Sequence, residues 1–180
     1  MTLTNIGENM KLIISMVFLA VLFAATVFAQ TKSVYTSTKT SACRTIKQSS
    51  AGAGYYVGEC TGVGGYKIQV LEDDIRQSIN VITPAKKKFE LDFWGLFPSF
   101  SAIGEKIEWR TKGGVPVALI TRYSVADPEG VKKDTSYLLV SKIGKTQSCV
   151  TDIVKPGPNQ NADARVLADA ASNKPCKKVE

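Results

Sequence analysis

The strongest constraint on the fold is a succession of short segments in which apolar and polar residues alternate, separated by turn-forming residues. Alternation with a period of two places apolar side chains on one face of a strand. Short strands that follow each other closely favour an antiparallel β-sandwich or barrel, here of about eight or nine strands, in a mainly β (α+β) protein. The expected strands are residues 43–48, 55–60, 65–72, 75–83, 88–93, 105–111, 115–124, 134–143 and 146–154.

The clearest expected hairpin turns at Gly113-Gly114. Glycine adopts the positive φ angles that a two-residue turn requires, so the strands on either side are expected to pair. Centring the pairing on this turn brings apolar residues of both strands onto one face. The resulting pairs are Ile107 with Ile120, Trp109 with Ala118, and Glu105 with Arg122, the last a structural ion pair at the rim of the core.

Two further turns are marked by short polar pairs. Asp73-Asp74 joins two strands, and adjacent aspartates can indicate acid chemistry. Aspartate carboxylates also bond to backbone N–H groups in turns, so we interpret this pair as a turn. A second hairpin, residues 134–154, is expected to turn at Gly144-Lys145. Its expected pairs are Leu139 with Val150 and Val140 with Cys149.

After Pro156-Gly157-Pro158 the pattern changes to that of one C-terminal helix. Asn159 or Asn161 provides the N-cap, and Asp163 in the first turn interacts favourably with the helix dipole. The helix is expected to end before residues 173–175. Its expected buried stripe comprises Val166, Leu167, Ala170 and Ala171.

The four cysteines allow three disulfide connectivities. Cys43 and Cys60 fall opposite each other if their strands form a hairpin around Ala51-Gly52. Cys149 lies on the last expected strand, and Cys176 directly follows the helix. We therefore predict the bridges Cys43–Cys60 and Cys149–Cys176, the second of which clamps the helix to the sheet.

Residues 1–29 have the pattern of a secretory signal peptide. Lys11 precedes 18 uncharged residues, Leu12–Ala29, and the small side chain of Ala29 suits cleavage directly after it. The alternative is an uncleaved membrane anchor, because about 20 apolar residues span a bilayer. Met10 is an alternative start to Met1. Export implies a periplasmic or secreted protein without a stable membrane anchor, in a compartment where disulfides persist.

Two parts are expected after the signal peptide. Residues 30–42 are rich in Thr and Ser and carry few large apolar side chains, which predicts a flexible leader. Residues 43–180 are expected to form a single β-rich domain.

The composition excludes several kinds of chemistry. The chain contains no histidine, so Ser-His-Asp and Cys-His catalysis and histidine-based metal sites are excluded. It has no C-x-x-C motif and no glycine-rich phosphate loop, so no cofactor or metal is expected. The net charge of +7 favours anionic envelope polymers, phospholipid headgroups or acidic proteins as partners, although a merely soluble basic protein has the same charge. No specific nucleic-acid binding is expected.

Short motifs are spread over most of the expected mature chain. They are Cys60-Thr61-Gly62-Val63-Gly64-Gly65-Tyr66, Asp74-Ile75-Arg76, Ile107-Glu108-Trp109-Arg110, Arg122-Tyr123, Cys149-Val150, and Asn161 through Ala164-Arg165-Val166-Leu167-Ala168-Asp169 to Cys176. In these motifs the chain resembles an uncharacterised family of small exported bacterial proteins with four cysteines. The resemblance implies an envelope or secreted setting, and it provides no activity and no catalytic residue.

The candidate ligand site combines three cations with nearby aromatic residues. Lys86, Lys87 and Lys88 precede an irregular segment that contains Trp94, Phe97 and Phe100. Cations attract anionic ligands and ring faces stack on sugars or bases, so these six residues are the candidate ligand contacts. The alternative is that the three rings belong to the core. Phe89, Leu91 and Phe93 alternate with Glu90 and Asp92, and we assign them to the inner face of a strand.

Three classes of function fit these observations. We predict the first, a non-enzymatic exported binding module that recognises an envelope protein or an anionic polymer, one form of which is a hydrolase inhibitor. The second class is a structural envelope component without a ligand site. The third is a glycan hydrolase, which needs two carboxyl groups about 5–10 Å apart in a cleft. Its candidate carboxylates are Asp73, Asp74, Glu105 and Glu108.

Overall fold

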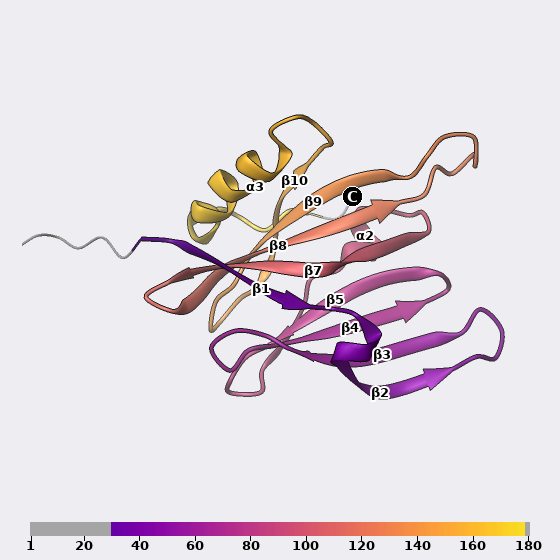
Figure 1. The fold of residues 1–180 in the computed structure, drawn as a ribbon, viewed down its shortest axis with the longest axis horizontal. Coiled ribbons are helices and arrows are strands. Elements are labelled where there is room, and N and C mark those ends of the chain that lie inside the picture. Colours follow the sequence, from indigo (N-terminus) through magenta and orange to yellow (C-terminus); the bar gives the residue numbers. More distant parts are fainter. Residues whose placement is uncertain (1–29, 179–180) are drawn as a thin grey trace, which may run out of the picture.

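Ten strands and a C-terminal helix make up residues 30–178, the part of the protein that the computed structural model describes (Figure 1). The predicted signal peptide lies outside these residues. The strands are β1 (Lys32–Ser37), β2 (Cys43–Ser49), β3 (Tyr55–Thr61), β4 (Lys67–Asp73), β5 (Arg76–Ile82), β6 (Lys88–Glu90), β7 (Ser101–Lys112), β8 (Val115–Val125), β9 (Thr135–Lys142) and β10 (Cys149–Val154). The helical segments are η1 (Thr40–Ala42), α2 (Phe93–Leu96), α3 (Gln160–Asp169) and η2 (Ala171–Asn173).

The strands form two antiparallel meanders within one sheet, whose order is β10-β9-β8-β7-β5-β4-β3-β2. The meanders meet at β5 and β7, which run parallel and share one residue pair, Arg76 with Ser101. β6 pairs with the C-terminal half of β5. The whole of β1 pairs with residues 106–111 of β7. The path of described strands is open from β10 to β2, so the sheet is not closed into a barrel.

The main core lies between the two meanders. Buried side chains from both pack into one cluster, as in the two layers of a sandwich. Burial of large apolar and aromatic side chains is the dominant favourable contribution to such a fold. The largest fully buried members are Trp109, Tyr123, Phe93, Ile68, Ile79, Ile107, Leu119 and Leu139. The prediction of a mainly β fold with one C-terminal helix is confirmed.

Helix α3 covers the opposite face of β8 and β9 (Figure 1). Ala164, Ala168 and Ala171 are buried there against Ala118, Ile120, Leu138 and Val140. The predicted stripe is therefore partly wrong, because Val166 is 70% exposed and Ala170 is exposed. The small alanine side chains, spaced four and three residues apart, let the helix backbone approach the sheet closely. Asn159 occupies the N-cap without a side-chain hydrogen bond.

Both predicted disulfides are present. Cys43 and Cys60 face each other at the start of β2 and the end of β3, with their Cα atoms 4.2 Å apart. Cys149, at the start of β10, is bonded to Cys176, which follows η2. No free cysteine is found among residues 30–178.

The prediction of a flexible leader at residues 30–42 is wrong for most of that segment. Residues 32–37 form strand β1, which lies antiparallel to β7. The indole N–H of Trp109 donates to the Thr36 hydroxyl at 2.8 Å, and Thr38 donates to the carbonyl of Gly104 at 2.6 Å. The low apolar content of this segment hid its order, because its side chains pair with polar groups of the domain.

Both predicted hairpin registers are also wrong, although the hairpins exist. A bulge at Val117 shifts the first hairpin by one residue, so Trp109 faces Leu119 and Ile107 faces Thr121. The second hairpin has a longer connection, residues 143–148, which moves the pairing by two residues and places Val150 opposite Ser141. The expected ion pair between Glu105 and Arg122 is consequently not formed: Glu105 contacts Lys39, and Arg122 donates to Ser136, Gln160 and Asn161.

Candidate binding groove

A row of four polar side chains crosses the first meander where the apolar core ends. Gln48, Tyr56, Glu72 and Gln77 are consecutive partners on β2, β3, β4 and β5. Residues two apart on a strand share a face, so Glu72 lies on the same face as buried Val70, and Gln77 lies on the same face as buried Ile79. The sheet thus presents a polar row on its inner face, directly beyond the core.

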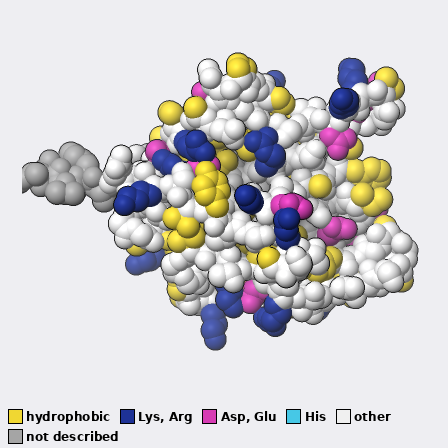
Figure 2. Space-filling view, viewed as in Figure 1, with side chains coloured by type: hydrophobic (Ala, Val, Ile, Leu, Met, Phe, Trp, Pro, Cys, Tyr) yellow, Lys and Arg dark blue, Asp and Glu magenta, His cyan; other side chains and the backbone are white. Residues whose placement is uncertain are grey.

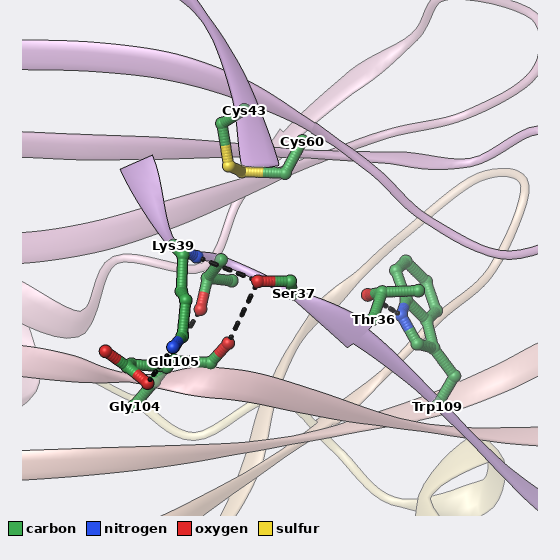
Figure 3. Close-up of a disulfide and its surroundings, with 9 residues drawn as sticks. Thr36, Ser37, Lys39, Cys43, Cys60, Gly104, Glu105 and Trp109 are labelled. Atoms are coloured by element: carbon green, nitrogen blue, oxygen red, sulfur yellow. Dashed lines mark hydrogen bonds and ion pairs between the residues drawn. A yellow bond between two sulfur atoms is a disulfide. The ribbon is translucent and has the colours of Figure 1, made fainter. Parts of the chain in front are cut away.

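The facing wall is formed by η1 and the first half of β7. The Thr38 N–H donates to the Glu105 carbonyl at 3.0 Å, and Lys39 Nζ lies 3.0 Å from the Glu105 carboxylate (Figure 3). The Cys43–Cys60 disulfide follows η1 and fixes the start of β2 to β3 (Figure 3). The wall is therefore held at both ends, by β7 and by the disulfide.

Between these walls lies a groove of about 640 Å³. Its lining is rich in hydroxyl, amide and carboxylate groups, with two tyrosines. The lining residues are Thr38, Lys39, Thr40, Ser41, Gln48, Ser49, Ser50, Gly54, Tyr55, Tyr56, Val70, Glu72, Gln77, Ile103 and Glu105.

Gln77 fixes the floor of this groove. Its side-chain oxygen accepts the Ile103 N–H at 2.9 Å, and its amide N–H donates to Glu72 Oε2. One carboxylate oxygen of Glu72 is therefore held in place, and no hydrogen bond to Oε1 is found among residues 30–178. Glu72 accordingly offers an oriented acceptor oxygen to a ligand.

The two tyrosines of the groove differ in role. The Tyr56 ring lies over Gly58, where the Cβ atom of any other residue would collide with the ring, and its buried hydroxyl has no partner among the described residues. Tyr55 is 44% exposed and directly precedes Tyr56 on β3, so its side chain lies on the opposite face of the strand. Tyr56 thus belongs to the floor, whereas Tyr55 lies at the edge of the groove.

The structure does not bring the predicted ligand contacts together. Lys88 lies opposite Ile82 at one end of β5, whereas Phe100 precedes Ser101, which pairs with Arg76 at the other end. Six residue steps along a strand separate these ends by roughly 20 Å. The three lysines and the aromatic segment therefore do not form one continuous site.

The aromatic segment is partly core. Phe97 is half-buried and packs on Tyr123 and Tyr137, with ring centroids 5.5 and 4.8 Å away. Trp94 is half-buried, and its indole nitrogen has no hydrogen-bond partner within residues 30–178. Phe100 is 52% exposed. Leu91 and Phe93 are buried, as predicted, but the strand ends at Glu90 and Phe93 begins α2.

The other candidate carboxylates have structural surroundings. Asp73 and Asp74 lie at the β4–β5 turn, as predicted, and Asp74 and Ile75 adopt φ angles of 51° and 57°. Glu108 lies in an ion-pair cluster with Arg165 and Arg110, and Arg110 also contacts Asp169. Burial disfavours the charged form of Glu108, but hydrogen bonds from Arg165, Ser33 and Tyr35 outweigh it and lower its pKa. Of the predicted carboxylates, only Glu105 lines the groove.

Sequence reasoning missed Glu72 and Gln77. Glu72 follows Val70, and Gln77 precedes Ile79, at the two-residue spacing that places side chains on the same face. The signal in the sequence was therefore a polar residue at a position where the alternation predicts an inward-facing side chain. That signal marks where the core ends, and it requires the pairing of β4 with β5 to show that the two side chains are neighbours.

Comparisons with protein-family models, with curated proteins and with solved structures find no match to this chain. Within residues 30–178, no helix is long and apolar enough to cross a membrane. In the same residues, no cluster of Asp, Glu, Cys or His side chains is placed to hold a metal ion.

Proposed function

We propose that the protein is an exported binding module whose groove holds a neutral oligosaccharide. The observation that carries this proposal is the polar row of Gln48, Tyr56, Glu72 and Gln77, which faces η1 across a preformed groove. The two disulfides are compatible with the expected periplasmic or secreted setting.

The lining favours a ligand that carries many hydroxyl groups. Hydroxyls both donate and accept, and the groove offers amide donors, carboxylate acceptors and further hydroxyls at close spacing. An anionic polymer suits this groove poorly, because two carboxylates and a single lysine line it.

The affinity test compares wild type with Glu72→Gln on immobilised oligosaccharides from the bacterial envelope. Loss of a charged acceptor should weaken binding roughly tenfold or more, since such a hydrogen bond contributes about 1.5–3 kcal/mol. Gln48→Ala, which removes another side chain of the polar row, is a second variant, and Glu90→Gln, an exposed residue on β6, is the matched control. Melting temperatures of all variants establish that they fold.

The proposal fails if the wild-type protein binds no oligosaccharide. It also fails if Glu72→Gln and Gln48→Ala bind as tightly as the wild type. Capture from an envelope extract of a protein alone, such as a hydrolase, would instead assign the groove to a protein partner.

The second candidate is a carboxylate-dependent glycan hydrolase, favoured by the presence of both Glu72 and Glu105 in one groove. A general acid is usually held in an apolar pocket that keeps it protonated, whereas the Glu105 side chain is 71% exposed and contacts Lys39. This difference favours binding over hydrolysis. Product release that is abolished by either Glu72→Gln or Glu105→Gln, with binding retained, would establish the hydrolase.

A further inference from the structure

Four connections meet at one end of the molecule. β4 begins beside the end of β5, β7 runs parallel to β5, and β9 ends beside the start of β8. The β3–β4, β5–β6, β7–β8 and β9–β10 connections therefore all lie at the same end, to the left and lower left in Figure 1. We call this end, comprising residues 62–66, 83–88, 112–116 and 143–148, the basic end.

The basic end carries five lysines and no acidic residue: Lys86, Lys87, Lys88, Lys112 and Lys145. All five are exposed. Within residues 30–178 none of the five forms a salt bridge; Glu90 lies two residues beyond Lys88 on β6, and the next acidic residues, Glu59 and Asp152, are paired with other cations. In the space-filling view, Lys and Arg side chains lie along the left and lower edges and also near the centre and upper right of the visible face (Figure 2). The lysine charges are therefore not neutralised locally.

An apolar cavity of about 460 Å³ lies among these lysines. Pro84, Ala85, Val115 and Pro116 line it, with Lys87 and Lys145 beside them, and Val115 is 56% exposed. Lys87 is held in place, because its Nζ donates to the Thr146 carbonyl at 3.3 Å and lies 4.8 Å from the centroid of the Phe89 ring. The basic end thus presents exposed apolar atoms beside exposed lysines, of which Lys87 is held in place.

We propose that the basic end docks on the surface of an anionic phospholipid bilayer. Lysines on three separate loops match a plane of lipid phosphates better than one small anion, which requires cations that converge on a point. Val115 and the adjacent prolines then enter the interface between headgroups and acyl chains.

A nucleic acid suits this surface less well. Single-stranded nucleic acids are bound by exposed aromatic rings on which the bases stack. Tyr66 is the aromatic residue of these four loops, and it is only 7% exposed.

The start of β1 also lies at the basic end, because Lys32 pairs with Thr111 near the end of β7. Docking there would place Gln30 on the membrane side.

The test is cosedimentation with phosphatidylcholine vesicles that contain or lack phosphatidylglycerol. We expect binding only to the anionic vesicles, weakened by salt. Lys86→Gln, Lys87→Gln and Lys88→Gln together should reduce affinity at least about tenfold, because each lysine near an anionic surface contributes to attraction. The matched control makes the same charge change away from the basic end, with Lys47→Gln, Lys132→Gln and Lys133→Gln.

A second variant tests the apolar contact. Val115→Ser leaves the charge unchanged, and it should reduce the binding that persists at high salt, with the melting temperature unchanged because Val115 is largely exposed. The proposal is overturned if the control triple variant loses as much affinity as the site variant, or if neutral vesicles bind equally well. Displacement from vesicles by inorganic phosphate at constant ionic strength would also overturn it, in favour of a small-anion site.

Discussion

Glu108 and Arg110 are the two charged residues that are buried among residues 30–178. They lie two residues apart on β7, so their side chains share one face, and both contact Ser33 of β1 and a residue of α3. Arg165 of α3 donates to both oxygens of Glu108, at 2.7 and 3.2 Å, and Arg110 donates to both oxygens of Asp169, at 2.8 Å each. Two reciprocal ion pairs therefore fasten the helix to the strand. Because each charge has a partner, the cost of removing it from water is offset.

Glu108→Gln should lower stability at neutral pH and alter its pH dependence. The pKa of Glu108 is lowered in the folded state, so its contribution is present above the unfolded pKa of about 4.3 and is lost as pH falls through the folded value. We expect a loss of about 1–3 kcal/mol at pH 7, which is a fall in melting temperature of several degrees. Thermal unfolding at neutral and acid pH measures it.

At acid pH the wild type and Glu108→Gln should converge, because the carboxyl group is then protonated in both folded and unfolded protein. Glu105→Gln is the control, since that side chain is 71% exposed and its surface pair contributes little. A constant difference between wild type and Glu108→Gln across all pH values would contradict the role given to the charge.

The role of a single residue could be predicted from the sequence where that role depends only on the residue and its own backbone. Asp73-Asp74 was correctly interpreted because turn preference is a property of the aspartate and its own backbone. Glu72 was missed because its role needs Gln77, the partner that β4–β5 pairing brings beside it. The predicted patch of lysines and aromatics failed to form one site because neighbours in sequence lie at opposite ends of β5.

At the scale of elements, the positions of strands were predictable and their registers were not. Apolar alternation located nine of the strands, β2 to β10, because it is independent of the partner strand. A bulge such as that at Val117 adds one residue on one strand only, and nothing in the alternation of β8 marks it, since β8 is apolar on both faces. β1 was missed because its stability comes from hydrogen bonds to β7.

Thr36→Val tests the contribution of β1 to the domain. Valine keeps the shape and the strand preference of threonine but removes the acceptor for the buried Trp109 indole N–H, which is 2.8 Å away. An unsatisfied buried donor costs about 1–3 kcal/mol, so the melting temperature should fall by several degrees. Thr40→Val, on the exposed part of η1, is the control. Equal melting temperatures for both variants would show that β1 contributes little.

At the scale of the whole molecule, neither disulfide joins the two meanders. Cys43–Cys60 lies within the first, and Cys149–Cys176 attaches the C-terminal segment to the second. Among residues 30–178, the strands of the two meanders pair directly only where β5 meets β7, with the Ser101 N–H donating to the Ile75 carbonyl at 3.1 Å, and β1, which leads into β2, pairs with β7. Besides these pairings the meanders share one core, which contains large side chains from both, including Ile68, Ile79, Trp109 and Leu119.

A shared core predicts that the protein unfolds as one unit even when either disulfide is removed. The bridges close loops whose ends are 17 and 27 residues apart, so each should stabilise the fold by about 3 kcal/mol. Replacing either pair of cysteines with alanine should therefore lower the melting temperature of the entire domain. Calorimetry should show one transition in each variant, because loss of either meander exposes the core face of the other. Two separate transitions, only one of them shifted by the substitution, would show that the meanders are independent and that the core between them is not the main source of stability.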